Sequence, residues 1–266
     1  MSGEDTPATP TDEGGGGALP GPTADQRARL AERLSRRTPD PADSGQTLPL
    51  TRAALALDDP VARLEAVVAA LARERVVVPV SVESDPRGSG HRGPDEGEAT
   101  HEFPTVGTPQ GPALVAYSSA AALAADRPGA RPAPVSSRTL ALTALVETGG
   151  RVVLDPGGSA GDGIRLPRPA VAALGQGDAW LPAWRDADLL AGLRRVARAG
   201  EGVVLDVRIP GNAGATQRVD LVVGGTPEGR DARNALAHTL RDLATHPRLL
   251  AACERIEIVP VRAFAA

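Results

Sequence analysis

The sequence predicts an α+β fold, in which a mixed-sheet N-terminal α/β domain is preceded by a disordered N-terminal tail and followed by a smaller αββαβ domain. Three observations support this prediction. Stretches with helical spacing of apolar residues alternate with short runs rich in Val, Ile and Leu, Gly and Pro stand at many of the junctions, and the first 47 residues lack a sustained apolar pattern. Because 266 residues can form two modest domains, we assign residues 1–47 to the tail, 48–184 to the first domain and 185–266 to the second.

The N-terminal tail is rich in Gly, Pro, Thr and Asp and includes a run of four glycines at residues 14–17. Because so little apolar surface is available to offset the entropy of ordering, we expect this segment to be disordered. Residues 25–37 have helical character, with Leu30 and Leu34 four positions apart among five arginines. They form either an interaction helix that folds on a partner or a frayed, solvated helix. We favour the second, because two leucines bury little surface.

The first domain begins with a helix and a strand. Asp59 is suited to cap a helix whose first residue is a proline, and apolar residues follow at spacings of three and four as far as about residue 74. Residues 75–82 then have the composition of a strand. Pro79 has no N–H to donate, so this strand is expected at a sheet edge or with a bulge at the proline. Residues 83–101 carry no apolar pattern and are interpreted as a flexible hairpin insertion.

Two serine pairs organise the middle of this domain, one at residues 118–119 and one at 136–137. Each pair follows a strand-like segment and precedes a helical one, so one serine of each pair is expected to cap a helix. The strand-like segments are 113–117 and 131–135, and the helices are 120–125 and one that ends near 147, stopped by Gly149 and Gly150. Helix capping explains these serines better than a nucleophile does, because no histidine is near them in the sequence.

Residues 151–182 combine a strand, a turn, a second strand and a helix. The strands are placed at 152–154 and 164–166, with a turn from Asp155 between them, and Pro169 can open a helix that ends at Gly175 or Gly177. The glycine-rich stretch after Asp155 could cradle a phosphate, but it lacks a Lys-Ser/Thr ending and leads into a strand rather than a helix. A simple turn is therefore the preferred interpretation.

The second domain is predicted as helix, strand, strand, helix, strand, with a three-stranded sheet covered on one face by helices. Asp186 caps the first helix, which carries acidic residues at its start and arginines near its end, as the helix dipole favours. Thr226 and the two residues after it are expected to cap the second helix. Pro247 should break that helix, and residues 256–259 should form the last strand.

Two strands lie between these helices, at 203–209 and 217–223. Their alternation of apolar and charged residues predicts an antiparallel hairpin with one solvent-exposed face, the wet face. Val203, Leu205, Val207 and Ile209 are expected on the buried face of the first strand. On the wet face, a register with Asp206 opposite Asp220 would also place Arg208 opposite Arg218. We therefore predict a register shifted by two residues, with Asp206 opposite Arg218 or Arg208 opposite Asp220.

Composition restricts the classes of partner. The net charge of −4, from 29 basic residues that are all Arg and 33 acidic ones, argues against nucleic acid as the main partner. No apolar run approaches the ~20 residues of a membrane span, and the acidic N-terminus lacks the features of a signal peptide. We therefore expect a cytoplasmic protein that binds neither membranes nor nucleic acid.

No metal or cofactor site is predicted. Cys253 is the only cysteine, so neither an intrachain disulfide nor an all-Cys zinc site can form. His238, Asp242, His246 and Cys253 are close in sequence, but the helix break at Pro247 works against their convergence. We also predict no catalytic residues, because the sequence contains no convergent set of catalytic side chains.

Several short pieces of sequence carry a resemblance to a known family. They are 58–60 (DDP), 76–80 (VVVPV), 113–117 (ALVAY) with the Ser-Ala-rich helix after it, 131–135 (RPAPV), 153–157 (VLDPG), and 166–169 (LPRP) on to Gln176. In this order they resemble the SseB protein N-terminal domain family over about 48–182, and the remainder is similar, more weakly, to the second half of the actinobacterial two-domain SseB-like proteins. The resemblance implies a cytoplasmic α/β module of unsettled biochemistry, and it brings no catalytic residues.

The only two tryptophans, Trp180 and Trp184, stand at the boundary between the two predicted domains. They either form a partner-binding patch or fill the junction between the two predicted domains as a plug, and we favour the plug. Together with Asp155 they are the candidate interface residues. The preferred hypothesis is a non-enzymatic interaction or regulatory module whose partner is another protein. The alternatives are a small-molecule sensor, for example for an amino acid, with its ligand between the domains near Asp155 and Trp180, and an enzyme of unknown type.

Overall fold

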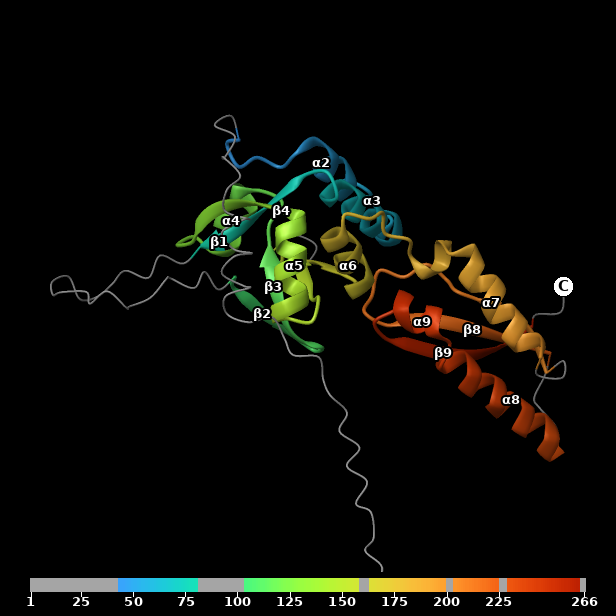
Figure 1. The fold of residues 1–266 in the computed structure, drawn as a ribbon. Helices are drawn as coiled ribbons and strands as arrows, with labels where there is room; N and C mark the ends of the chain where they lie inside the picture. The colour runs from blue at the N-terminus through green and yellow to red at the C-terminus, as the bar shows by residue number, and fades with distance from the viewer. Residues whose placement is uncertain (1–42, 81–102, 158–162, 200–202, 225–228, 264–266) are drawn as a thin grey trace, which may run out of the picture. The chain divides into compact units, whose positions relative to one another are not determined.

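The computed structural model describes residues 43–80, 103–157, 163–199, 203–224 and 229–263, and Figure 1 shows the order of its elements. Most of the predicted tail, with its helix, lies outside the described residues, as do the predicted insertion and the predicted cap at Thr226. Helices and mixed sheets together make an α+β protein, as predicted. In the described part of the chain, no helix combines the length and the hydropathy needed to cross a bilayer.

Two helices come first, α2 (Pro49–Leu55) and α3 (Pro60–Leu71). Asp59 caps α3 as predicted, because its carboxylate accepts a backbone N–H of the first turn at 2.7 Å. Glu74, which the prediction placed at the end of α3, lies beyond it and caps α2 instead. Its carboxylate accepts two backbone N–H groups of α2, at 2.9 and 2.8 Å. α2 was not predicted, because its capping carboxylate is more than 20 residues away in sequence.

β1 (Arg75–Val80) and β4 (Arg131–Ser136) form a two-stranded antiparallel sheet. Neither strand is central, so the edge position predicted for Pro79 is confirmed. On its other side β1 meets Tyr117 through a bridge, in which Val77 and Tyr117 exchange backbone hydrogen bonds at 2.9 and 2.8 Å. This bridge ties the small sheet to the residue that follows β3 of the larger one.

The larger sheet has the order β2-β3-β5-β6. Its strands are β2 (Thr105–Thr108), β3 (Gly111–Ala116), β5 (Val152–Leu154) and β6 (Ile164–Leu166). β3 and β5 are parallel and the other pairs antiparallel, so the predicted mixed sheet is confirmed. β2 was not predicted, because its sequence TVGT has no run of apolar residues. The parallel pair brings the turns that follow β3 and β5 to the same edge of the sheet.

The three helices associated with this sheet start and stop within one residue of the predicted positions. They are α4 (Ala120–Asp126), α5 (Ser137–Glu147) and α6 (Arg168–Gln176). Ser119 caps α4 and Ser136 caps α5, each by accepting a backbone N–H at 3.1 Å. α6 ends at Gly177, whose φ of 83° is a left-handed conformation that glycine adopts without strain.

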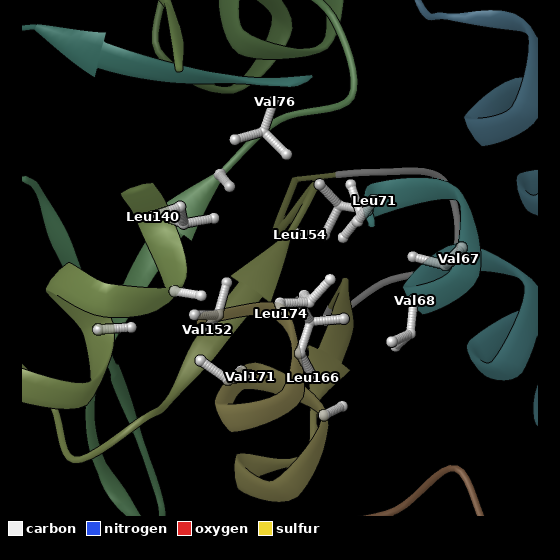
Figure 2. Close-up of a cluster of buried hydrophobic side chains, with 14 of the residues drawn as sticks. Val67, Val68, Leu71, Val76, Leu140, Val152, Leu154, Leu166, Val171 and Leu174 are labelled. Atoms are coloured by element: carbon white, nitrogen blue, oxygen red, sulfur yellow. The ribbon is translucent and has the colours of Figure 1, made fainter. Parts of the chain in front are cut away.

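The first hydrophobic cluster lies where α3, α5 and α6 meet one face of the larger sheet (Figure 2). Its fully or nearly buried members are Ala, Val and Leu, among them Leu71, Leu140, Val152, Leu154 and Val171. α5 and α6 pack against each other over this face. With aromatic residues at 2% of the chain, close packing of aliphatic side chains has to supply most of the apolar burial, at about 1.5–3 kcal/mol for each large side chain.

The C-terminal elements follow the predicted order, with a short 3-10 turn before the first helix and a separate short helix after the predicted break at Pro247. They are the 3-10 turn η1 (Ala183–Arg185), α7 (Ala187–Arg198), β7 (Val204–Arg208), β8 (Gln217–Val223), α8 (Gly229–Ala244), α9 (Pro247–Ala252) and β9 (Ile256–Arg262). The sheet has the order β7-β8-β9, with β8 and β9 parallel. α9 arises at the predicted break, since Pro247 is its first residue and the ring Nδ1 of His246 accepts the Leu249 N–H at 3.4 Å. Apolar residues of α7, α8, α9 and the sheet form a second cluster.

The predicted register of the hairpin is confirmed, but the predicted placement of Leu205 on the buried face is wrong. Arg208 lies opposite Asp220 in the antiparallel pair of β7 and β8, which is one of the two shifted registers. However, the pairing shifts between Val204 and Asp206, so Leu205 is an extra residue that bulges from the ladder. Leu205 is therefore 58% exposed instead of buried, and Val204 takes its place in the second cluster.

Residues Pro41–Ala266 group by their contacts into one compact unit. Within it, the buried residues of the first cluster come from Ala54 to Leu174, and those of the second from Ala183 to Leu249. Trp184 packs against both clusters. Two separate clusters are compatible with a domain boundary near residue 184, and that boundary stays a prediction.

Candidate functional site

The two tryptophans contact each other edge to face, with ring centroids 5.8 Å apart and ring planes at 90°. The indole N–H of Trp184 donates to the Glu65 carboxylate of α3 at 2.5 Å. Trp184 packs against both clusters and Trp180 against the first, and both rings are half-buried. Such internal contacts favour the plug interpretation of this pair over an exposed patch.

A cavity of about 60 Å³ lies beside the tryptophan pair. Its walls include both tryptophans, Arg151 and Arg165 of the larger sheet region, and Cys253 after α9. The buried Nε1 of Trp180 has no hydrogen-bond partner within the described residues. Asp155, which the sequence placed near the same ligand, does not line this cavity. The structure therefore separates the predicted interface residues into a tryptophan pair beside a cavity and an aspartate elsewhere on the sheet.

Asp155 lies directly after β5, at the edge where the parallel strands end. Among the described residues it is the one non-glycine with a positive φ, of 50°, a conformation that Asp tolerates better than most residues. Its N–H donates to Ala116 O at 2.9 Å, and its Oδ1 accepts the Ser118 N–H at 2.8 Å. Burial raises the pKa of Asp155, against the effect of its hydrogen bonds from Ser118. Asp155 thus fastens the turn after β5 to the turn after β3.

A second polar pair, a buried tyrosine and an exposed aspartate, lies at the same edge. The Tyr117 hydroxyl donates to the Asp126 carboxylate at 2.5 Å, and the Tyr117 ring is fully buried. Burial and this hydrogen bond both raise the pKa of the Tyr117 phenol. A Cβ at Gly157 would stand 2.5 Å from Asp126 Oδ1, so only glycine fits beside the carboxylate. These groups satisfy one another, as expected of side chains that hold a turn in place.

A basic hollow of about 620 Å³ is lined by residues of α7 and α9 and by the residue before α9. Its charged lining residues are Arg194, Arg195, Arg198, His246, Arg248 and Asp188, with Ala191 and Gly192 between them. Gly192 lies beside the imidazole, since a Cβ there would be 3.4 Å from His246 Nε2, an ordinary van der Waals distance. From the sequence, the α7 arginines are explained only as complements of the helix dipole. The hollow was missed because α9 supplies its other wall from about 50 residues further along the chain.

Half of the arginines in the basic hollow are fixed by carboxylates. Arg248 donates to both oxygens of Asp186 at 2.8 Å, and these bonds hold the pKa of Asp186 below its ordinary value. Arg194 donates to Asp206 at 2.8 Å. Neither Arg195 nor Arg198 has an ion-pair partner in the part of the chain that the structure describes. Within the described residues, the hollow therefore holds two guanidinium groups without a carboxylate partner.

The residues considered for metal binding or nucleophilic chemistry have other contacts. His238 pairs with Asp242 at 3.6 Å on an exposed helix face, and His246 caps α9. Burial raises the pKa of the Cys253 thiol to about 11, so it is neutral at physiological pH. Within the described ranges, no group of three or more His, Cys, Asp or Glu side chains is arranged to hold a metal ion.

The first part of the chain has a recognisable family. Residues 50–173 match the model of the SseB protein N-terminal domain. This segment of the chain is assigned to the SseB N-terminal domain family. The SseB N-terminal domain runs from α2 into α6 and includes Asp155, whereas both tryptophans and the basic hollow lie after the matched residues. No curated protein and no solved structure matches the chain.

Proposed function

We propose that this chain is a non-enzymatic protein-interaction module, and that its basic hollow binds an acidic segment of a partner protein. The observation that carries the proposal is the gathering of four arginines and a histidine around one hollow, in a chain whose net charge is −4. A local field of the opposite sign to the whole molecule attracts acidic ligands to one place and orients them there.

The arginines of the basic hollow fall into two groups, those bound by carboxylates of the chain and those that are not, and this supports the proposal. Arg194 and Arg248 are held by carboxylates of the chain itself, so they form walls whose geometry is fixed before a partner arrives. Arg195 and Arg198 are three residues apart on α7 and therefore project to neighbouring positions on one helix face. Each guanidinium offers five N–H donors and can take a carboxylate through two parallel hydrogen bonds.

An acidic peptide suits the basic hollow better than a nucleic acid does. Asp188 lines the hollow, and Asp186 and Asp206 bind its arginines, so a continuous row of phosphates would meet carboxylates as well as guanidinium groups. The lining also contains no Phe, Tyr or Trp on which a base could stack. Separate Asp or Glu side chains of a peptide can bind Arg195 and Arg198, which have no acidic partner among the described residues.

The proposal can be tested with the full chain and a fluorescently labelled glutamate-rich peptide, by anisotropy at two salt concentrations. We expect salt-sensitive binding that weakens at least about tenfold in the double variant Arg195→Glu/Arg198→Glu. Two attractive contacts become repulsive in this variant, and exposed ion pairs are worth about 0.2–1 kcal/mol each, where 1.4 kcal/mol is tenfold. Added salt should weaken binding to the native chain by screening the same charges.

A matched control separates the basic hollow from net charge. Arg73→Glu/Arg230→Glu makes the same charge change at two exposed arginines outside the hollow, and it should leave peptide affinity nearly unchanged. A glutamine-rich peptide of equal length should not bind. Equal losses in the two double variants, or tighter binding of a single-stranded oligonucleotide than of the peptide, would refute the proposal.

A further inference from the structure

His246 differs from the arginines that line the basic hollow, because its ring can donate a hydrogen bond as a neutral group. Its Nδ1 accepts the Leu249 N–H at 3.4 Å and so caps α9. A ring nitrogen that accepts carries no proton, so the proton of the neutral imidazole is on Nε2. The cap therefore fixes which nitrogen of His246 can donate to a ligand.

The donating nitrogen opens onto the basic hollow. His246 lines the hollow, and within the described residues its Nε2 has no hydrogen-bond partner. The side-chain polar atoms that are both buried and unpaired in that part of the chain are Arg75 Nη1 and Trp180 Nε1. Because His246 Nε2 is unpaired and is not one of these buried atoms, solvent reaches it, and a ligand in the hollow can do the same.

Arg195 lies beside the same nitrogen. A Cβ at Gly192 of α7 would lie 3.4 Å from His246 Nε2 and 3.8 Å from Arg195 Nη2. Both donors thus approach one point on α7, where glycine presents no side chain to separate them. Arg195 has no ion-pair partner among the described residues, so an imidazole N–H and a guanidinium without acidic partners stand next to each other in the hollow.

Two further contacts fix the imidazole relative to α7. Arg248, two residues after His246, donates to both oxygens of Asp186 at 2.8 Å, and Asp186 caps α7. Leu249 is fully buried in the second cluster. The orientation of the Nε2–H is therefore set before a ligand arrives, and less conformational freedom is lost on binding.

Resting on the function proposed above, we propose that one carboxylate of the acidic segment bridges His246 and Arg195, accepting the imidazole Nε2–H with one oxygen and the guanidinium with the other. A carboxylate has about four lone-pair positions on its two oxygens, so it can accept both donors at once. A guanidinium attracts any nearby acid, whereas an imidazole N–H binds only within hydrogen-bond distance. His246 thus determines where the segment is anchored, and Arg198 is left for a second acidic side chain.

His246→Asn tests the imidazole donor, because Asn removes the ring and keeps an oxygen that can cap α9. The measurement is the anisotropy of the labelled glutamate-rich peptide with the full chain, at about pH 8, where histidine side chains are ordinarily neutral. We expect binding at least about fivefold weaker, because a hydrogen bond to a charged acceptor is lost. The control His238→Asn makes the same change on an exposed face of α8 outside the hollow, and it should bind the peptide like the native chain.

Double variants show whether His246 and Arg195 bind one carboxylate. In His246→Asn/Arg195→Gln the fold-loss of affinity should be smaller than the product of the two single losses, because both changes act on the same group. In His246→Asn/Arg198→Gln it should be close to that product, since Arg198 binds a different acidic side chain. Losses that multiply fully for His246 and Arg195 would mean that they bind separate groups, and the bridge would be wrong.

Nuclear magnetic resonance on the native chain does not depend on how well a variant folds. The chain has four histidines, and the ring signals of His246 are those that disappear in His246→Asn. The nitrogen chemical shifts of the free chain at about pH 8 should place the proton of His246 on Nε2, and the peptide should shift that Nε2–H signal in a saturable way while the His238 signals stay in place. A proton on Nδ1, or an Nε2–H signal that the peptide does not move, would overturn the bridge.

The bridge and the basic hollow can fail separately. Salt-sensitive peptide binding that is lost in Arg195→Glu/Arg198→Glu but unchanged in His246→Asn would support the proposed function and refute the bridge. A native chain that does not bind the peptide would refute both.

Discussion

At the scale of single residues, Asp155 shows how one side chain can hold two distant turns together. Its positive φ is unfavourable for most residues, and the structure keeps it through hydrogen bonds to Ala116 and Ser118. Asp and Asn populate this conformation more readily than other non-glycine residues because their short polar side chains can bond locally. The position therefore requires both a tolerant backbone and an acceptor for the Ser118 N–H.

Asp155→Asn should change how stability depends on pH. Burial raises the pKa of Asp155 above its ordinary value near 3.8, so the native state holds this proton more tightly than the unfolded chain does. The stability that protonated Asp155 contributes is complete below pH 3.8 and is lost as the pH rises through the raised pKa. Asn does not ionise. The free energy of unfolding of the variant, measured with urea, should therefore rise relative to that of the native protein between pH 3 and 7.

Ser118→Ala provides the complementary measurement. The Ser118 hydroxyl lowers the pKa of Asp155 against the effect of burial, so its removal should raise that pKa further and extend the loss of stability to higher pH. The account of Asp155 would be contradicted if the difference in unfolding free energy between Asp155→Asn and the native chain did not vary with pH.

Sequence reasoning succeeds at residues whose partners are local. Asp59, Ser119, Ser136 and Asp186 cap helices as predicted, because a cap bonds to an N–H only two or three residues away. It fails where the partner is distant, since Asp155 bonds to Ser118 across 37 residues. The unpaired Trp180 N–H and the basic hollow depend on tertiary packing in the same way, so no local pattern predicts either feature.

At the scale of elements, β7 shows where the alternation of apolar and charged residues fails to predict which side chains are buried. Strict alternation predicted Leu205 on the buried face, but the bulge adds one residue and puts Val204 there instead. The charges on the other face do predict the register, since Arg208 lies opposite Asp220. The ion pairs nevertheless run along the strands, as Arg208 bonds to Asp206 and Arg218 to Asp220.

The bulge can be tested by shortening two leucines of the C-terminal elements, one in β7 and one in α7. Leu205→Ala should change the free energy of unfolding by no more than about 0.5 kcal/mol, because surface substitutions act weakly. Leu193→Ala removes a fully buried side chain of α7 and should cost about 2–5 kcal/mol. Urea unfolding gives both values, and similar losses would mean that Leu205 is buried as strict alternation requires.

The start of α7 depends on Asp186 in two ways, which two substitutions separate. Asp186 accepts the Leu189 N–H at 2.9 Å and binds Arg248. Asp186→Ala removes the cap and leaves Arg248 with only its longer ion pair, to Asp188 at 3.7 Å, and it should cost about 2 kcal/mol. Asp186→Asn keeps a capping oxygen and should cost less.

The same aspartate predicts a dependence on acid. The bond from Arg248 lowers the pKa of Asp186 below 3.8, so the stabilisation is present above that pH and is lost as the pH falls through the lowered pKa. The difference in unfolding free energy between the native chain and Asp186→Asn should therefore shrink in strong acid. A difference that is the same at neutral and low pH would assign the effect to the cap alone.

At the scale of the whole molecule, two aliphatic clusters share one aromatic residue. Trp184 packs against both clusters and donates to Glu65 of α3, and Arg185 pairs with the same carboxylate at 3.2 Å. The sequence placed the tryptophans at a predicted domain boundary and predicted the order of elements on either side, except for α2 and β2. It could not show that one ring would contact both clusters, since that contact depends on how α3 is placed beside the 3-10 turn that holds Trp184.

Trp184→Ala should therefore reduce the cooperativity of unfolding as well as stability. Removing a large side chain from a packed site costs about 3–5 kcal/mol, and here the loss falls on the contacts that join the two clusters. We expect the native chain to unfold in one transition, and Trp184→Ala to show separate transitions by Trp180 fluorescence and by far-ultraviolet circular dichroism. Trp184→Phe keeps most of the ring and loses the bond to Glu65, so it should stay cooperative at a cost of about 1 kcal/mol. Coincident transitions in Trp184→Ala would show that the clusters are coupled through other contacts, and that Trp184 is not the residue that joins them.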